Sequence, residues 1–129
     1  MAAERLIVDG MNVIGSRPDR WWERRREAMI ELVEDLAAYV DASSEEVSVV
    51  FDSRPFEVPS GGDRVRVLFA SRRGRDAADD DITAMVTADE NPGSITVVTS
   101  DSALAKRVRD AGAAVIGSGG FRRRLDEVI

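Results

Sequence analysis

Short apolar runs alternate along the chain with longer segments in which apolar residues recur every three or four positions. The runs are rich in valine and isoleucine, which is typical of strands buried in a parallel sheet. They predict five strands, at 5–9, 46–52, 64–70, 95–99 and 113–116. The run at 64–70 alternates at first between apolar and arginine positions, which favours a place nearer a sheet edge.

The segments between these runs have helical periodicity. The first carries an apolar stripe that predicts a helix over 19–41, with Pro18 at its first turn. A second stripe predicts a helix that ends before Asn91, and a third predicts one that stops at Gly112. A short last helix is expected after a glycine-rich turn at 117–120.

This alternation predicts an α/β protein, a Rossmann-like three-layer α/β/α sandwich around a mostly parallel sheet of about five strands. We expect a single domain over residues 1–129, because no repeat, low-complexity tract or linker divides the chain. The segment 53–63 has no helical pattern and is barely long enough to join two parallel strands. Parallel pairing remains the prediction, because it places Asp79 at the same sheet edge as the other strand-end acids.

Composition removes several kinds of chemistry. The chain has no cysteine and no histidine, which excludes disulfides, Cys/His zinc sites, thiol nucleophiles and histidine acid–base pairs. A hydrolase built from this sequence must use carboxylates, alone or with Mg²⁺ or Mn²⁺, which prefer oxygen ligands. The formal net charge is −6, yet the arginines occur in clusters that suit phosphate contacts or solvated helix faces.

The location is predicted from the absence of membrane and export signals. No apolar run approaches the roughly 20 residues of a membrane span, and the first residues lack a signal-peptide layout. We therefore expect a cytoplasmic protein that does not bind a membrane. The oligomeric state stays open, a homo-oligomer included.

Aspartates mark several of the predicted strand ends. Asp9 and Asp52 each end a buried strand, whereas Asp79 and Asp101 each open a helix. In an open parallel sheet the ligand crevice lies outside the carboxyl ends of the strands, so these carboxylates should converge there. Crowded carboxylates repel one another unless a cation lies among them, which predicts a divalent metal site. The amide of Asn12 can donate and accept, which suits positioning of a phosphate or a metal-bound water.

Some of these residues also have a purely structural interpretation. Asp101 follows Thr99-Ser100 and has the composition of a helix cap, and Asp79 can be interpreted in the same way. Gly10, beside Asp9, is expected to allow a tight backbone turn.

Four motifs follow one another in order: Asp9-Gly10-Met11-Asn12, Val50-Phe51-Asp52, Ala78-Asp79 and Thr99-Ser100-Asp101. This order resembles an NYN domain, and more narrowly the YacP-like branch of the PIN-like nucleases. The likeness extends from Leu6 to about Leu125. It implies a Rossmann-like sheet and a Mg²⁺- or Mn²⁺-dependent endoribonuclease, with RNA, expected to be single-stranded, as its partner.

The resemblance assigns roles by position. The matching catalytic residues are Asp9, Asn12, Asp52, Asp79 and Asp101, and the four aspartates among them are the expected metal ligands. Asp79 fits the spacing to Ile82 in the following helix. The choice of ligand in this segment stays open between Asp76, Asp79, Asp80 and Asp81.

A mechanism follows from these roles. A metal-activated water would attack the phosphorus in line and leave a 5′-phosphate and a 3′-hydroxyl, because chemistry through the 2′-hydroxyl usually relies on histidine. Substrate contacts are expected from Asn12, from Ser100 and from the loop arginines Arg72, Arg73 and Arg75. Either tryptophan of the Trp21-Trp22 pair is suited to stacking on a base or to closing the core.

Two other classes of function remain. A non-catalytic RNA- or partner-binding module on the same fold would lack metal-dependent cleavage. A receiver-type phosphoacceptor domain would also carry strand-end acids. However, Gly10 stands where that family pairs acids, and the chain's only lysine, Lys106, lies before the fifth strand rather than after it.

Overall fold

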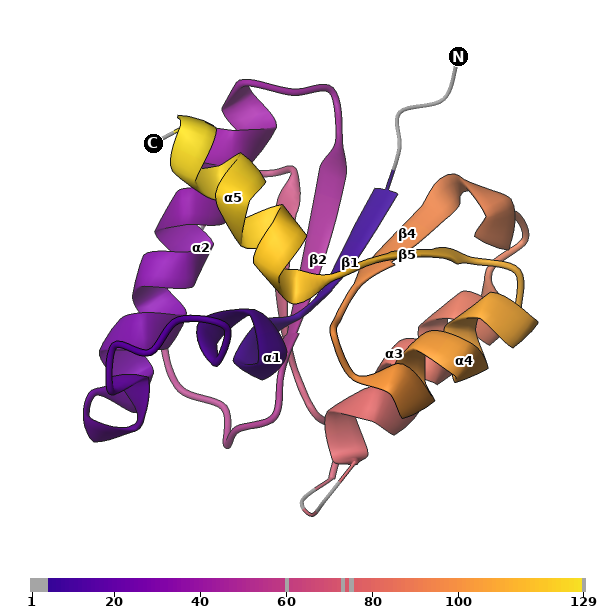
Figure 1. Cartoon of the computed structure of the whole chain (residues 1–129), viewed down its shortest axis with the longest axis horizontal. Helices are drawn as coiled ribbons and strands as arrows, with labels where there is room; N and C mark the ends of the chain where they lie inside the picture. The colour runs from indigo at the N-terminus through magenta and orange to yellow at the C-terminus, as the bar shows by residue number, and fades with distance from the viewer. Residues whose placement is uncertain (1–4, 60, 73, 75, 129) are drawn as a thin grey trace.

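Strands and helices alternate through the computed structural model, which describes residues 5–59, 61–72, 74 and 76–128 (Figure 1). The strands are β1 (Arg5–Asp9), β2 (Glu46–Phe51), β3 (Val65–Phe69), β4 (Ile95–Val98) and β5 (Ala114–Ile116). The helices are α1 (Gly10–Ile14), α2 (Arg25–Asp41), α3 (Ala77–Ala88), α4 (Ser102–Asp110) and α5 (Ser118–Val128). Two short 3₁₀ turns are η1 (Trp21–Glu23) and η2 (Pro92–Ser94).

The five strands form one parallel sheet in the order β3-β2-β1-β4-β5. β1 is central: Asp9 pairs in register with Val50 of β2, and Val8 pairs with Val98 of β4. The chain therefore leaves β1, β2 and β4 at the same edge of the sheet, which is the edge predicted to collect the acids. The parallel pairing and the edge position of β3 are confirmed.

Helices cover both faces of the sheet, as expected for a three-layer α/β/α sandwich (Figure 1). Leu6 and Val8 of β1 belong to one buried cluster, which includes residues of α1, α2 and α5. Ile7, between them, belongs to a second cluster with residues of α3 and α4. This division follows from the strand geometry, because successive side chains point to opposite faces.

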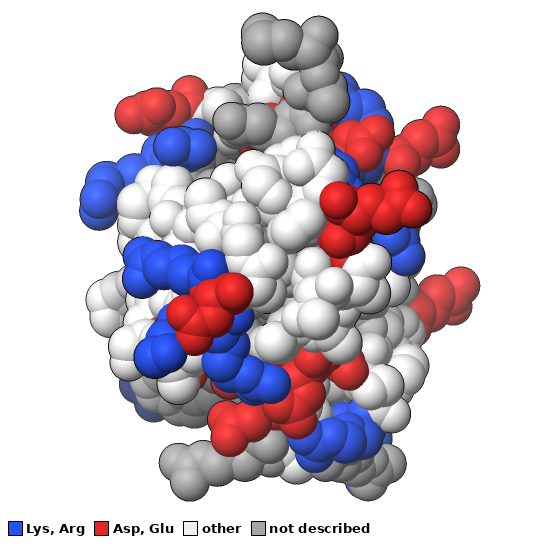
Figure 2. Space-filling view, turned by 90° about the vertical axis from the view of Figure 1, so that its right-hand side faces the viewer, with Lys and Arg blue, Asp and Glu red and all other residues white. Residues whose placement is uncertain are grey.

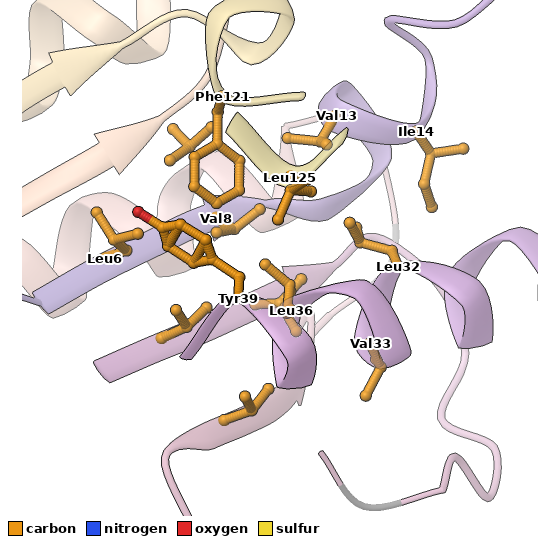
Figure 3. Packing of buried hydrophobic residues seen from close by; sticks show 14 of the residues in the cluster. Leu6, Val8, Val13, Ile14, Leu32, Val33, Leu36, Tyr39, Phe121 and Leu125 are labelled. Atoms are coloured by element: carbon orange, nitrogen blue, oxygen red, sulfur yellow. The ribbon is translucent and has the colours of Figure 1, made fainter. Parts of the chain in front are cut away.

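The last helix, α5, packs against the buried cluster that contains Leu6 and Val8. Phe121 and Leu125 of α5 are fully buried beside Val8 of β1 and Leu36 of α2 (Figure 3). The rings of Tyr39 and Phe121 meet edge to face, with their centroids 5.4 Å apart. This packing fixes the position of the first turn of α5, close to the carboxyl edge of the sheet.

Two helix boundaries differ from the predicted ones. The helix expected from residue 19 begins at Arg25, because the left-handed backbone at Arg20 (φ 58°) and the 3₁₀ turn η1 precede it. The turn expected at 117–120 is already helical from Ser118, where the Phe121 amide bonds the Gly117 carbonyl at 3.0 Å. Tertiary packing overrides the low helix propensity of the glycines here.

Gly10 is needed for space and not for the tight turn that the sequence suggested. It starts α1 directly after Asp9, and its φ is not among the positive values of the described glycines. A Cβ atom at Gly10 would lie 2.5 Å from Cδ1 of Phe51, which is itself fully buried. Any larger residue would therefore push on the core beneath the end of β1.

The described residues of the crossover from β2 to β3 form no helix, as the sequence predicted for 53–63. Phe56 instead packs against Phe69, with ring centroids 5.7 Å apart, and the guanidinium of Arg26 lies 4.8 Å from the Phe56 ring centroid. These contacts take the place of a helix in covering this side of the buried cluster that contains Leu6 and Val8.

Candidate active site

An open cavity of about 320 Å³ lies at the carboxyl edge of the central strands. We call it the acid cavity. Its lining residues are Asp9, Met11, Asn12, Asp52, Asp76, Ala78, Asp79 and Asp101. All five residues predicted to be catalytic therefore line one cavity, although they come from four separate parts of the chain.

Asp9 is the most enclosed of the acids. It ends β1, is 7% exposed, and accepts a hydrogen bond on Oδ2 from the hydroxyl of Thr99 at 2.9 Å. The pKa of Asp9 is raised to about 6, mainly by burial, with a smaller contribution from the charges of Asp79 and Asp101; the hydrogen bonds from the Thr99 hydroxyl and the Asn12 main-chain N–H oppose the rise. A nearby cation would stabilise the ionised form of a carboxyl in this setting.

Asp79 lies in the first turn of α3 and is half-buried. Burial raises the pKa of its carboxyl, and the negative charges of Asp101 and Asp76 add to the rise. Asp76 precedes α3 in the left-handed conformation (φ 66°) and also lines the acid cavity. This backbone is uncommon for a residue other than glycine, although aspartate tolerates it better than most. The acid cavity therefore contains a fifth carboxylate, outside the predicted set.

Asp101 caps α4. Its Oδ1 accepts the amides of Ala103 at 2.9 Å and Leu104 at 3.0 Å, so the structural interpretation of this residue is confirmed. The second oxygen, Oδ2, has no hydrogen bond from a described residue. Capping therefore occupies one oxygen of Asp101 and leaves the other for a ligand in the acid cavity.

Asp52 follows β2 and is half-buried. The Arg25 guanidinium donates to its main-chain oxygen at 2.8 Å, which anchors the end of β2 to α2. Its side chain lines both the acid cavity and a neighbouring cavity of about 600 Å³, which Arg54 and Arg72 also line. Asp52 thus stands between a negative and a partly basic surface.

Asp80 and Asp81, the other acids of this segment, are engaged in contacts away from the acid cavity. Asp80 pairs with Arg72 and, at 2.9 Å, with Arg107 of α4. Asp81 accepts hydrogen bonds from the amide and the hydroxyl of Ser71. The structure therefore separates the four candidates, with Asp76 and Asp79 on the acid cavity.

The predicted basic loop is only partly described. Arg72 lies at the neighbouring cavity in a pair with Asp80, while Arg73 and Arg75 fall outside the described residues. Figure 2, which views the side of the molecule at the right of Figure 1, shows acidic and basic side chains against one another in its lower part. Much of the upper middle of this surface is uncharged.

The tryptophans do not line the acid cavity. Trp21 packs against the buried cluster below α2, and Trp22 is 60% exposed. Of the two suggested roles, Trp21 closes the core, whereas the ring of Trp22 is exposed and meets that of Trp21 edge to face, with centroids 6.1 Å apart.

A set of hydrogen bonds links the acid cavity to the last helix. Asn12 Oδ1 accepts the amide of Ser100 at 2.8 Å and the hydroxyl of Ser118 at 2.6 Å. The amide of Ser118 donates to the Ser100 hydroxyl oxygen at 2.9 Å. Ser100, predicted to contact substrate, therefore contacts Asn12 and α5 instead of lining the cavity.

Sequence reasoning missed the roles of two residues in this region, Thr99 and Ser118, which are both 1% exposed. Asp76 was among the four open candidates for the ligand in its segment. Thr99 had a local signal, because a threonine two residues before a capping aspartate can bond that residue's amide, as it does here at 3.1 Å. Ser118 had none, because its partner lies 106 residues away.

The residues of the acid cavity are of the types that bind a divalent ion, but their side chains do not form a complete set of direct ligands. In the part of the chain that the structure describes, no three acidic side chains stand close enough together to bind one ion directly. The expected tight cluster is therefore absent, because Asp9 and Asp101 are held by their own hydrogen bonds and the charges repel. The donor set nevertheless fits Mg²⁺ or Mn²⁺, which need oxygen ligands; Mg²⁺ is often held by one or two carboxylates and several waters.

Sequence comparison places this geometry in a known family. The sequence profile of the YacP-like NYN domain matches residues 6–129. The chain belongs to the YacP-like NYN family. This is a family of nuclease-type domains with a PIN-like fold, so the resemblance drawn from the motifs is confirmed, and the receiver-type alternative is wrong.

Solved structures agree with this assignment. The chain is similar to Rae1 (YacP) from Bacillus subtilis, with 26% identity and a TM-score of 0.72 over 99% of this chain and 75% of that one. The W164L mutant of the same protein gives 28% identity and a TM-score of 0.79 over 97% and 76%. No curated protein sequence matches. Among the described residues of this YacP-like NYN protein, no helix is long and apolar enough to cross a membrane.

Proposed function

We propose that this YacP-like NYN protein is a metal-dependent endoribonuclease that hydrolyses phosphodiester bonds in single-stranded RNA. One observation carries the proposal: carboxylates from distant parts of the chain line a single cavity at the carboxyl edge of the sheet, in a member of a nuclease-type family. Ligands of open α/β sheets bind at this edge.

Four aspartates, Asp9, Asp52, Asp79 and Asp101, would hold Mg²⁺ or Mn²⁺, and Asp76 is placed to join them. When bound, such an ion supplies an activated water and neutralises charge on the phosphate. The chain has no histidine to protonate the leaving oxygen, so that proton comes from water.

The remaining residues orient and attract the substrate. Thr99 holds Asp9 in one orientation, and Asn12 faces the phosphate from α1. We assign the RNA backbone to Arg72, Arg73 and Arg75, because basic residues offset the repulsion of the substrate by an acidic site. Of these, Arg72 lines the cavity that shares Asp52 with the acid cavity. Ser100 supports Asn12 through its amide.

The test is cleavage of an end-labelled single-stranded RNA in Mn²⁺, in Mg²⁺ and in EDTA. Cleavage should require the metal and leave 5′-phosphate ends. Asp9→Asn should reduce the rate at least about 100-fold and keep the fold, because replacing even a residue that only supports a metal ligand costs 10–100-fold. Asp41→Asn, an exposed aspartate on α2, is the matched control. Full activity of Asp9→Asn would refute the proposed site.

A non-catalytic RNA-binding module is the second candidate. The observation in its favour is that the described acids do not form a direct three-carboxylate metal site. RNA binding without cleavage in any of the divalent ions, by a folded protein, would establish this function in place of the nuclease.

A further inference from the structure

Asn12 lines the acid cavity, but its side-chain oxygen turns away from it. Oδ1 accepts the Ser100 amide at 2.8 Å and the Ser118 hydroxyl at 2.6 Å. A main-chain N–H can only donate, so the oxygen of the Asn12 amide must be the atom that faces Ser100. A carbonyl oxygen has two lone pairs, and these two donors use both. The Asn12 oxygen is therefore not available as a metal ligand while the two bonds persist.

The nitrogen Nδ2 is the part of Asn12 that remains for the acid cavity. It carries two N–H donors, and no described residue accepts a hydrogen bond from it. In the proposed nuclease, the carboxylates around it would be ligands for a cation. An amide nitrogen instead suits an anionic oxygen on the substrate, because a hydrogen bond to a charged acceptor is stronger than one between neutral groups.

Ser118 is built into the fold at this point. It is the first residue of α5, is 1% exposed and does not line the acid cavity. Its hydroxyl donates to Asn12, and its amide donates to the Ser100 hydroxyl at 2.9 Å. The packing of Phe121 and Leu125 on the sheet fixes the helix that carries it (Figure 3). The Ser118 hydroxyl can therefore influence the acid cavity through the orientation of the Asn12 amide, which is its one hydrogen-bond partner among the described residues.

We propose that Ser118 is a positioning residue that fixes the Asn12 amide with its nitrogen toward the acid cavity, where that nitrogen donates to a non-bridging phosphate oxygen of the substrate. The inference rests on the proposed nuclease function and deepens it. Asn12 is assigned as a phosphate donor and not as a metal ligand. A residue near the C-terminal end of the chain is thereby added to the site.

The test measures two affinities for each variant of the full chain. Mn²⁺ binding is measured by calorimetry without RNA. RNA binding is measured by anisotropy of a labelled single strand in Ca²⁺, with a gel to show that the RNA stays intact. The variants are Asn12→Ala, Ser118→Ala and the double variant. Ser44→Ala, an exposed serine before β2, is the matched control.

Asn12→Ala and Ser118→Ala should each weaken RNA binding roughly tenfold, the usual effect of losing one hydrogen bond to a charged group. The double variant should be no weaker than Asn12→Ala alone, because Ser118 acts through Asn12. Ser118→Thr, which keeps the hydroxyl, should restore most of the affinity. Mn²⁺ affinity should stay unchanged in all of these variants.

Additive losses in the double variant would overturn the positioning role of Ser118. A loss of Mn²⁺ affinity in Asn12→Ala would overturn the donor role, because it would make the Asn12 oxygen a ligand. If Ser118→Ala does not fold, Ser118→Thr still tests the part played by the Ser118 hydroxyl, and Asn12→Asp tests the donor role of Asn12. Asn12→Asp keeps an acceptor for Ser100 and Ser118 but replaces the donor nitrogen, so RNA binding should fall while Mn²⁺ binding does not.

These outcomes separate the two proposals. A wild-type protein that neither binds Mn²⁺ nor cleaves RNA would refute the nuclease and the phosphate-donor role together. A wild-type protein that cleaves RNA, but whose Asn12 and Ser118 variants lose binding additively, would refute the positioning role alone.

Discussion

The hydroxyl of Thr99 lies 2.9 Å from Oδ2 of Asp9 and joins the end of the central strand, β1, to the end of its neighbour β4. Both residues are buried, and Thr99 also accepts the amide of Asp101 at 3.1 Å. One hydroxyl therefore orients the most enclosed carboxylate and shapes the turn that leads to a second one.

Thr99→Val removes this hydroxyl and keeps the shape of the side chain. We expect the free energy of unfolding to fall by about 1–3 kcal/mol, because the Asp9 carboxylate and the Asp101 amide lose a buried partner. RNA cleavage should fall as well, because Asp9 is no longer held. Urea denaturation and cleavage rates check both effects. Thr96→Val, in β4 just before Thr99 and without a side-chain hydrogen bond to any described residue, should change neither. Equal effects of the two variants would contradict the role of Thr99.

The acids of 76–81 should separate into two functional groups. Asp76→Asn and Asp79→Asn should each reduce RNA cleavage and Mn²⁺ affinity, because both side chains line the acid cavity. Asp80→Asn and Asp81→Asn should keep cleavage within about fivefold of the wild type. Asp80 makes exposed ion pairs, which contribute about 1 kcal/mol or less, and Asp81 bonds Ser71 away from the acid cavity. Cleavage rates and calorimetry with Mn²⁺ show which of the four variants lose activity and metal affinity. A stronger effect of Asp80→Asn than of Asp79→Asn would show that the site is assigned incorrectly.

Gly10→Ala should destabilise the protein by about 1–3 kcal/mol, because the new methyl group would overlap the Phe51 ring. The change also moves the start of α1 away from β2, so activity should fall with stability. The melting temperature and a urea titration measure the effect. Gly93→Ala is the control, because its new Cβ would meet only Asn91 Oδ1 at 3.7 Å. A neutral Gly10→Ala variant would refute the close contact.

The opposite edge of the sheet should respond to acid. Arg5 holds Asp89 with two hydrogen bonds, at 2.6 and 2.8 Å, and Arg5 together with the Asn91 amide lowers the pKa of Asp89 to about 2 from its ordinary 3.8. A carboxyl with a lowered pKa adds stability above its unfolded-state value, and that contribution is lost as pH falls through the folded value. The stability difference between wild type and Asp89→Asn should therefore be constant above pH 4 and shrink toward pH 2.

Urea titrations between pH 2 and pH 6 measure this difference. Asp41→Asn, which removes an exposed carboxylate without an ion pair to a described residue, should show no such decline. A difference between wild type and Asp89→Asn that persists at pH 2 would contradict the assignment.

Much of the fold could be predicted because it depends on local patterns. The apolar runs at 5–9 and 46–52 are buried on both sides of the sheet, and such runs have few alternative structures. The acids that end or follow these strands then reach one edge by topology alone. Patterns of this kind cannot show how a carboxylate is oriented, so the capping bond of Asp101 stayed undecided between two interpretations.

The parts that sequence could not predict depend on contacts between distant segments. Ser118 lies in a stretch that has the composition of a turn, and it is helical and buried where α5 packs on the sheet beside Ser100 and Asn12. The need for glycine at position 10 depends on the ring of Phe51, which no local pattern connects with it. The separation of Asp79 from Asp80 likewise depends on Arg107, 27 residues further along.

The docking of α5 has a consequence for biosynthesis. A growing polypeptide acquires every acidic group of the cavity by residue 101, but Ser118, which holds the Asn12 amide, is made later. Phe121 and Leu125 must also leave the ribosome before that helix can pack. The site is thus fully ordered only after α5 has folded. A chain that ends before α5 would have all the aspartates of the acid cavity, but its Asn12 amide would lack the hydrogen bond from Ser118.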